Sequence, residues 1–138
     1  MGRIMALDVG DRKIGVAITD PLAIMATPLT TLRFKDENEK ISKSAALANE
    51  NQVSQIVIGM PKNLKGAEDV QANKTKAFAE NLSKFTKAEI IFVDERLTTK
   101  KALNDLGYLS IKKIKEKDIL DMQAAVNILE TYLSMRKF

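Results

Sequence analysis

The first twenty residues constrain the fold most, because they contain two strand-like runs joined by a short polar turn. Residues 4–7 form a continuously apolar run, which is typical of a strand buried on both faces. Residues 14–19 are β-branched or small throughout, and the turn Gly10-Asp11-Arg12 separates the two runs. Gly15 lets another element approach the second run closely. We therefore predict a hairpin around which the rest of the chain is organised.

Asp8 follows the first apolar run directly, at a place where an ionised carboxylate is rare without a partner. Two interpretations of this residue stay open. A strand-end aspartate is often a turn former that accepts hydrogen bonds from its own backbone. Alternatively, the carboxylate is held at the sheet edge to bind a metal or to move a proton.

The size and composition of the chain indicate one globular domain. With 138 residues, of which 45% are hydrophobic, the chain can bury a substantial core. Arg3 and Asp8 interrupt the apolar N-terminus, which does not resemble a signal peptide, and no apolar run reaches the length of a membrane span. We expect a single domain over residues 1–138, located in the cytoplasm.

The sequence contains neither cysteine nor histidine. This absence excludes Ser-His-Asp and Cys-His catalysis, thiol chemistry and ordinary zinc sites. Any chemistry must depend on carboxylates, Lys, Tyr, Ser and Thr, or on a hard cation. Oxygen ligands favour Mg²⁺ or Mn²⁺ as that cation.

The positive charge is concentrated in one segment. The chain has a net charge of +4, yet residues 96–117 carry +5 and the remainder sums to −1. Such a local excess predicts that an anionic partner binds there. The basic residues of the segment are Arg96, Lys100, Lys101, Lys112, Lys113, Lys115 and Lys117.

The remaining periodicities predict alternating strands and helices. We expect a strand at 23–32 whose Pro28 places it at a sheet edge, a helix at 38–51, a strand at 55–59, a helix from 69 or 70 to 85, a strand at 89–93, a short helix from 98 or 99 to 106, a basic loop at 108–117 and a helix at 118–135. The order β-β-β-α-β-α-β-α-α predicts an α/β fold: a mixed five-stranded sheet with helices on both faces.

In the helix ending near 85, the inward residues are expected to be Val70, Lys74, Ala77, Phe78 and Leu82.

An acidic residue interrupts the apolar stripe of the final helix. Stepping back by three and four residues from Ala124 and Ala125 leads to Asp121, near the start of the helix. An acid in the first turn can simply complement the helix dipole, but Asp118 is better placed for that role. The stripe itself consists of Ala124, Ala125, Ile128, Leu129, Tyr132 and Leu133.

A third acidic position follows the apolar run at 90–93. Both Asp94 and Glu95 come at the end of that strand, and spacing alone does not choose between them. Carboxylates gathered at strand ends and at a helix start repel one another, and a divalent cation relieves that repulsion. Such carboxylate-bound ions promote phosphodiester cleavage. The residues therefore favour a metal-dependent nucleic-acid site.

Four motifs in order resemble one protein family over nearly the whole chain. They are Leu7-Asp8-Val9-Gly10-Asp11-Arg12-Lys13-Ile14-Gly15-Val16-Ala17, residues 59–66 (Gly-Met-Pro-Lys-Asn-Leu-Lys-Gly), residues 94–99 (Asp-Glu-Arg-Leu-Thr-Thr) and residues 121–129 (Asp-Met-Gln-Ala-Ala-Val-Asn-Ile-Leu). Together they resemble the bacterial Holliday junction resolvase-like family, also described as pre-16S rRNA nucleases, which has an RNase H-like fold. The resemblance implies that Asp8, Glu95 and Asp121 are the catalytic, metal-binding acids, and so favours Glu95 over Asp94.

The same resemblance implies a function. We expect a metal-dependent nuclease, a hydrolase using Mg²⁺ or Mn²⁺, that processes the end of precursor 16S ribosomal RNA during ribosome biogenesis. Alternatives are a Holliday junction resolvase acting on branched DNA, for which a homodimer rather than a monomer would be needed, and a non-catalytic module that binds RNA or a transcription complex. The Asp8-Val9-Gly10 turn also resembles that of actin-like ATPases, but those proteins close two such domains around a nucleotide.

Several polar residues are candidates for phosphate contact. Arg12, Lys62, Asn63 and Arg96 follow strands whose ends should surround the acids, and Lys112, Lys113 and Lys115 lie in the basic loop. The alternative for each is a solvated surface side chain.

Overall fold

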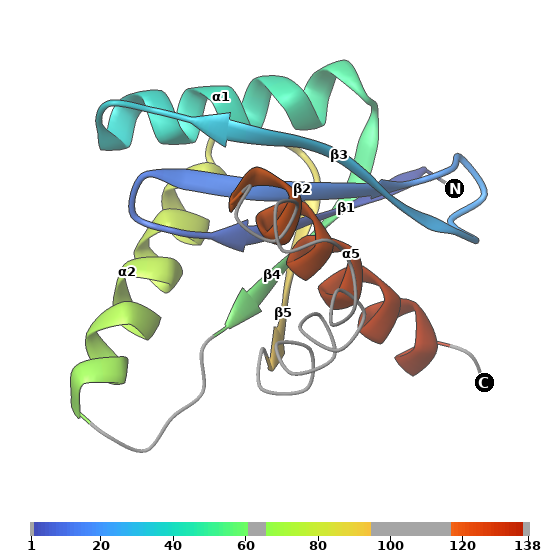
Figure 1. The fold of residues 1–138 in the computed structure, drawn as a ribbon. Helices are drawn as coiled ribbons and strands as arrows, with labels where there is room; N and C mark the ends of the chain where they lie inside the picture. Colours follow the sequence, from blue (N-terminus) through green and yellow to red (C-terminus); the bar gives the residue numbers. More distant parts are fainter. Residues whose placement is uncertain (1, 61–65, 95–116, 137–138) are drawn as a thin grey trace.

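The computed structural model describes residues 2–60, 66–94 and 117–136 (Figure 1). The described elements are β1 (Arg3–Val9), β2 (Lys13–Thr19), β3 (Ala26–Arg33), α1 (Glu37–Glu50), β4 (Val53–Met60), α2 (Gly66–Leu82), β5 (Glu89–Asp94) and α5 (Lys117–Met135). They occur in the predicted order. The short helix expected before residue 107 and the basic loop expected at 108–117 lie outside the described residues, apart from Lys117, which begins α5.

The five strands form one mixed sheet in the order β3-β2-β1-β4-β5. β1 pairs with β2 and β2 with β3 in antiparallel fashion, whereas β1, β4 and β5 run parallel to one another. The carboxyl ends of β1, β4 and β5 therefore lie at the same end of the sheet, together with the turn that joins β1 to β2. In that turn, the Gly10 N–H donates to the Lys13 carbonyl over 3.0 Å, so the predicted hairpin is confirmed.

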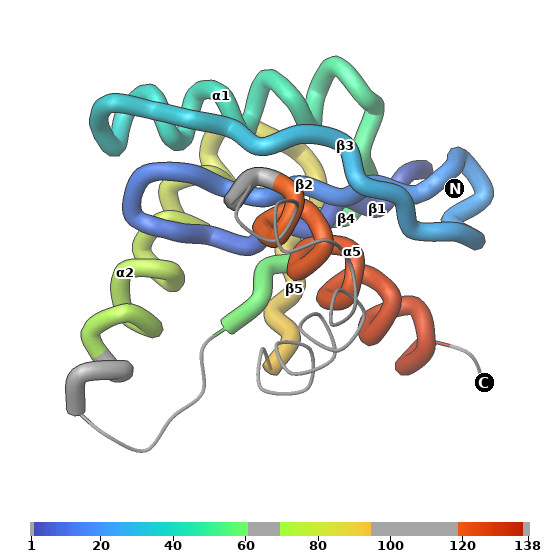
Figure 2. Tube along the Cα trace, viewed as in Figure 1, coloured from blue at the N-terminus to red at the C-terminus, as the bar shows by residue number. Residues whose placement is uncertain are grey.

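Helices cover both faces of the sheet, as predicted. α1 and α2 lie on one face and α5 crosses the other (Figures 1 and 2). Alternate residues of each strand enter one of two cores, because successive side chains point to opposite faces. The core under α1 and α2 includes Met5, Leu7, Ile14, Val16, Ile56, Ile58, Phe78 and Leu82. The core under α5 includes Ile4, Ala6, Ala17, Val57, Val93, Ala125, Ile128 and Leu129.

The edge strand β3 begins three residues later than predicted, because a turn occupies residues 20–25. The carboxylate of Asp20 accepts hydrogen bonds from the backbone N–H groups of Leu22, Ile24 and Met25. These bonds, led by the one from Met25, lower the pKa of Asp20. Pro28 lies in β3, which is an edge strand of the sheet, as expected.

Asp36 caps the N-terminus of α1, where its carboxylate accepts the Glu39 N–H over 2.8 Å. The inward face of α1 includes Ile41, Ala45 and Ala48, which are buried, and Leu47 packs beside them half-buried.

The predicted inward face of α2 is wrong in its first half. Val70 is 56% exposed, and Lys74 and Ala77 are also exposed. The buried residues are Thr75, Phe78, Ala79 and Leu82, which follow spacings of three and four from the two large side chains. Phe78 and Leu82 fix the helix rotation because they bury the most apolar area, and Val70 lies outside that stripe.

The apolar stripe of α5 holds the helix against its face of the sheet. Ala125, Ile128 and Leu129 are fully buried, and Tyr132 and Leu133 pack beside them half-buried. Within the described residues, every helix falls short of the length and apolarity that crossing a bilayer requires.

Candidate active site

Asp8 lies near the carboxyl end of β1, on the face that α5 covers. The alternation along β1 decides this, since Met5 and Leu7 enter the core under α1 and α2, while Ile4 and Ala6 enter the core under α5. Asp8 follows the phase of Ile4 and Ala6. Its side chain is half-buried, at the last paired positions of the strand.

Asp121 reaches the same place from the first turns of α5. In the β1–β2 ladder, Asp8 is paired with Gly15. The backbone of Asp121 lies directly over Gly15: a Cβ built at Gly15 would overlap the Asp121 carbonyl group and come within 2.9 Å of its Cβ. Only glycine allows this approach, which confirms the predicted role of Gly15. The structure therefore brings Asp8 and Asp121, 113 positions apart in the sequence, to one end of one face.

Lys13 also belongs to this cluster. Its Nζ lies 3.2 Å from Oδ2 of Asp121, with side-chain exposures of 22% for Lys13 and 28% for Asp121. Lys13 is two residues before Gly15 and so shares its face of β2. The sequence reasoning assigned no role to Lys13, although a basic residue in phase with Gly15 on a largely buried strand was a usable signal.

The carboxylate of Asp121 is not saturated by this contact. Oδ2 is buried but accepts no hydrogen bond from the residues that the structure describes. The 3.2 Å contact with Lys13 is therefore an ion pair that lacks hydrogen-bond geometry. A buried carboxylate oxygen without a hydrogen-bond donor is rare, because the hydrogen bonds that it makes to water in the unfolded chain are then not replaced. Such an oxygen is a suitable ligand for a cation.

Arg12 lies in the exposed turn between β1 and β2, at the end of the sheet that carries Asp8. Its neighbour Asp11 forms a loose ion pair with Lys74 of α2, at 3.9 Å between exposed side chains. The turn thus places Arg12 in solvent at the end of the sheet that carries Asp8, where it is accessible to an anionic ligand.

The end of β5 separates the two candidates for the third acid. Val93 enters the core under α5, and Asp94 is the next residue of the strand, paired with Met60. By alternation Asp94 belongs to the opposite face from Asp8. Glu95, Arg96, Lys62, Asn63, Lys112, Lys113 and Lys115 lie outside the described residues. Among residues 2–60, 66–94 and 117–136, no three acidic side chains form a metal-binding group.

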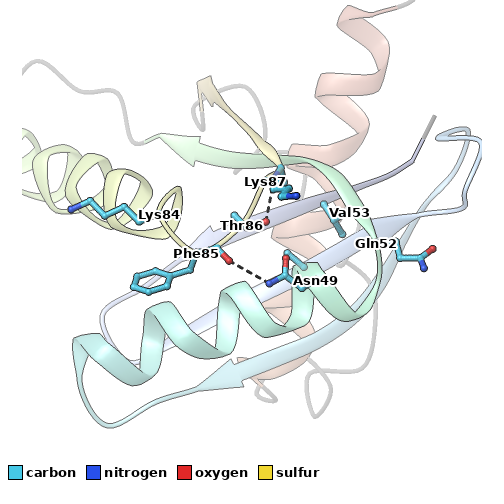
Figure 3. A pocket seen from close by; sticks show the side chains of 9 residues that line it. Asn49, Gln52, Val53, Lys84, Phe85, Thr86 and Lys87 are labelled. Carbon is cyan, nitrogen blue, oxygen red and sulfur yellow. Dashed lines mark hydrogen bonds between the residues drawn. The ribbon is translucent and has the colours of Figure 1, made fainter.

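A hollow in the described part of the chain lies elsewhere. It has a volume of about 520 Å³ and is lined by Asn49, Gln52, Val53, Lys84, Phe85 and Lys87, among others (Figure 3). Val53 begins β4 and Ala88 directly precedes β5, so the hollow is at the amino ends of the parallel strands. It is separate from the carboxylates at their carboxyl ends.

The arrangement at the carboxyl ends can bind a hard cation and an anion together. Two carboxylates on one face supply oxygen ligands, and Lys13 and Arg12 supply positive charge within or beside the cluster. Parallel strands commonly place ligand sites at their carboxyl ends. This combination suits chemistry on a phosphate group.

Comparison with known proteins identifies relatives of the whole chain. The family RuvX, described as Holliday junction resolvase, matches residues 2–135. A protein of Sulfurihydrogenibium sp. (strain YO3AOP1) named "Putative pre-16S rRNA nuclease" is 45% identical, covering 100% of this chain and 94% of the relative. A protein of Thermoanaerobacter pseudethanolicus with the same name is 40% identical, covering 98% of each.

Solved structures support the fold. The RuvC protein of T. thermophilus, in complex with a Holliday junction substrate, superimposes with a TM-score of 0.60 at 11% identity, covering 99% of this chain and 97% of that one. The fowlpox virus resolvase, in complex with Holliday junction DNA, gives a TM-score of 0.60 at 14% identity, covering 98% and 99%. At such low identity the similarity concerns the fold alone. The fold that this chain shares with the two resolvases agrees with the mixed sheet predicted from its sequence.

Proposed function

We propose, since this chain belongs to the RuvX family of Holliday junction resolvases, that it is a metal-dependent nuclease that processes the end of precursor 16S ribosomal RNA. In this proposal residues 1–138 form one nuclease domain, which acts in the cytoplasm. The names of the relatives support the ribosomal RNA substrate. The family description supports a nucleic-acid substrate in general.

The observation that carries the proposal is the meeting of Asp8 and Asp121 at one end of the α5 face. The two carboxylates come from the first strand and the last helix, and Gly15 is the point at which the backbones approach. Carboxylates placed in this way without a catalytic role would repel each other and weaken the fold. Their meeting on a face built largely of apolar side chains, beside the ammonium of Lys13, supports a functional site.

The donor set fits a hard divalent cation. Carboxylate oxygens are the ligands that Mg²⁺ and Mn²⁺ prefer, and Oδ2 of Asp121 is buried with no hydrogen-bond donor among the described residues. We assign Asp8, Glu95 and Asp121 as the residues that would hold Mg²⁺ or Mn²⁺. When bound, such a cation offsets charge on the phosphate and lowers the pKa of water.

Glu95 is preferred to Asp94 as the third acid. The pleat of β5 assigns Asp94 to the face opposite Asp8, whereas Val93 shares the Asp8 face. Asp94 is therefore poorly placed to join Asp8 and Asp121. Its neighbour Glu95 remains the candidate, as the family resemblance implied.

The remaining candidates would bind the nucleic-acid backbone. Arg12 is exposed in the turn beside Asp8, and its guanidinium can form two hydrogen bonds to one phosphate. We assign the same role to Lys62, Asn63, Arg96, Lys112, Lys113 and Lys115. Contacts of this kind position a polyanion without reading its sequence. Hydrolysis then adds water across one P–O bond and leaves a phosphate monoester and a hydroxyl group.

Branched DNA is the second candidate substrate, favoured by the family description as Holliday junction resolvase. Cutting a symmetric four-way junction needs two active sites and hence a homodimer, whereas trimming an RNA end needs only a monomer.

The test compares cleavage of precursor 16S ribosomal RNA with cleavage of a synthetic four-way DNA junction, in Mg²⁺, in Mn²⁺ and in EDTA. We expect metal-dependent cleavage of the RNA. The variants Asp8→Asn, Glu95→Gln and Asp121→Asn should each lose at least about 100-fold in rate, which corresponds to roughly 2.7 kcal/mol. Preference for the junction would replace the RNA proposal with the DNA one.

Asp94→Asn is the matched control for Glu95→Gln. Asp94 is the adjacent acid in the sequence, and it is not assigned to the metal site. This variant should cleave within about threefold of the wild-type rate. Absence of cleavage of either substrate under all conditions would favour a non-catalytic binding module and overturn the proposal.

A further inference from the structure

The ion pair between Lys13 and Asp121 places a positive charge inside the candidate metal site. Lys13 begins β2, on the same face as Gly15, and its ammonium lies 3.2 Å from Oδ2 of Asp121. Both side chains are largely shielded, at 22% and 28% exposure. The contact is therefore stronger than an ordinary surface pair, though still partly screened by solvent.

The geometry of the contact neutralises Asp121 without saturating it. Oδ2 is buried and accepts no hydrogen bond from any described residue, including Lys13. An ammonium prefers to donate a directed hydrogen bond to a carboxylate. In this contact the two opposite charges are close, but the ammonium does not donate such a hydrogen bond to Oδ2. A divalent cation that coordinates Oδ2 directly would compete well for the same oxygen.

We propose that Lys13 is the internal counter-ion of the metal site. Its ammonium compensates Asp121 while the metal is away and leaves Oδ2 when Mg²⁺ or Mn²⁺ binds, so Lys13 lowers the affinity for metal. The inference rests on the proposed function, since it takes Asp121 to be a metal ligand. Once displaced, the Lys13 side chain remains at the site end of β2, within reach of an anionic substrate.

A different role for Lys13 would change the metal affinity of the Lys13 variant in the opposite direction. If Lys13 served to hold Asp121 in the orientation that binds metal, removing it would weaken metal binding. If Lys13 is a counter-ion, removing it eliminates both the competition for Oδ2 and the repulsion between an ammonium and the incoming cation. Metal affinity then increases, and the direction of the change separates the two roles.

The experiment measures the dissociation constant of Mn²⁺ by calorimetry for the wild type, Lys13→Met and Lys13→Arg, in the absence of substrate. Lys13→Met should bind Mn²⁺ about three- to tenfold more tightly, whereas Lys13→Arg should stay within about twofold of wild type. Should Lys13→Met fold poorly, Lys13→Gln provides the same loss of charge with a polar side chain.

Lys43→Met is the matched control. Lys43 pairs with Glu39 over 3.1 Å on α1, so this variant removes the same charge and an ion pair of similar length, remote from the site. Its affinity for Mn²⁺ should equal that of wild type. An equal gain in both variants would mean a general effect of net charge and would overturn the assignment of Lys13.

Melting curves add a readout that does not depend on catalysis. The rise in Tm between EDTA and excess Mn²⁺ should be larger for Lys13→Met than for wild type. An unchanged or weakened affinity in Lys13→Met would overturn the inference while leaving the metal site standing. Failure of the wild type to bind Mn²⁺, or undiminished binding by Asp121→Asn, would instead overturn the proposed metal site, and Lys13 as its counter-ion with it.

Discussion

The two faces of the sheet are built from side chains of different size. On the face that α1 and α2 cover, the strands present Met5, Leu7, Ile14, Val16 and Ile58, which pack against Phe78 and Leu82. On the face that α5 covers, Ile4 and Val57 are large, but the hairpin strands present Ala6 and Ala17, then Asp8 and Gly15 at the site end.

Because of this difference in side-chain size, one face can contribute mainly to stability and the other can allow close approach of a helix. Large side chains bury more apolar area, so the first face contributes more to stability. Small side chains let a helix backbone approach the sheet, and at Gly15 the backbone of Asp121 comes into direct contact. A carboxylate on the helix can thereby join a carboxylate on a strand. The comparison indicates that one face supports the fold while the other places the site.

Truncating the large-residue face should give the largest loss of stability. Phe78 is fully buried, and its ring also lies 5.1 Å from the ammonium of the buried Lys40. Phe78→Ala should reduce the free energy of unfolding by about 3–5 kcal/mol, because it removes apolar contacts and leaves a cavity. Urea unfolding measures this loss.

Phe85→Ala is the control for the same chemical change at an exposed position, since Phe85 is 60% exposed. It should change stability by no more than about 0.5 kcal/mol. If Phe78→Ala were equally mild, the stabilising role of this face would be contradicted.

Adding one methyl group to the small-residue face should damage the site more than the fold. In Gly15→Ala the new Cβ would overlap the Asp121 backbone, so the start of α5 must shift. We expect a loss of about 1–3 kcal/mol in stability and clearly weaker binding of Mn²⁺, as measured by calorimetry.

Gly2→Ala makes the same substitution at the other end of the sheet, where the new Cβ would meet the Ser54 side chain at 2.9 Å. Its affinity for Mn²⁺ should not change. Unaltered metal binding by Gly15→Ala would show that close approach of α5 is not needed for the site.

The smallest effect concerns the basic residues that precede α5 in the sequence. Changing Lys112, Lys113 and Lys115 to Ala should weaken binding of RNA. The slope of log K against log salt should fall by about 0.7–0.9 for each phosphate that the variant no longer binds. Changing Lys84 and Lys87, which line the hollow in Figure 3, together with the exposed Lys76 of α2, is the control. Equal slopes for the two triple variants would mean that the basic residues before α5 make no particular contribution to RNA binding.

The sheet and both helix layers could be predicted from the sequence, because the spacing of apolar residues indicates which side chains of a strand or helix are buried. The apolar run at 4–7 and the spacing of Ala125, Ile128 and Leu129 were sufficient to place β1 and α5. The inward face of α2 was misjudged because Val70 and Ala77 fit a helical spacing equally well, and only contact with the sheet settled the rotation about Phe78.

The site was predictable only in part. Asp8 and Asp121 were predicted as site residues because acids in apolar patterns are unusual, and the structure brings them to one end of the sheet. The close approach at Gly15 was predictable because glycine in a strand permits it. The ion pair of Lys13 with Asp121 joins residues far apart in the sequence, and its geometry depends on the tertiary structure. Glu95 remains a prediction, since it lies outside the described residues.

The central claim is that the α5 face ends in a carboxylate site for a divalent cation. Melting curves of the wild type and of the Asp8→Asn/Asp121→Asn double variant, in EDTA and in excess Mn²⁺, test it most directly. The wild type should gain about 2.7 kcal/mol when free metal is 100-fold above its dissociation constant. The double variant should gain nothing, and in EDTA it should lie within about 1 kcal/mol of wild type, since the ion pair that it removes is partly exposed. An equal gain in both proteins, or none in the wild type, would contradict the account.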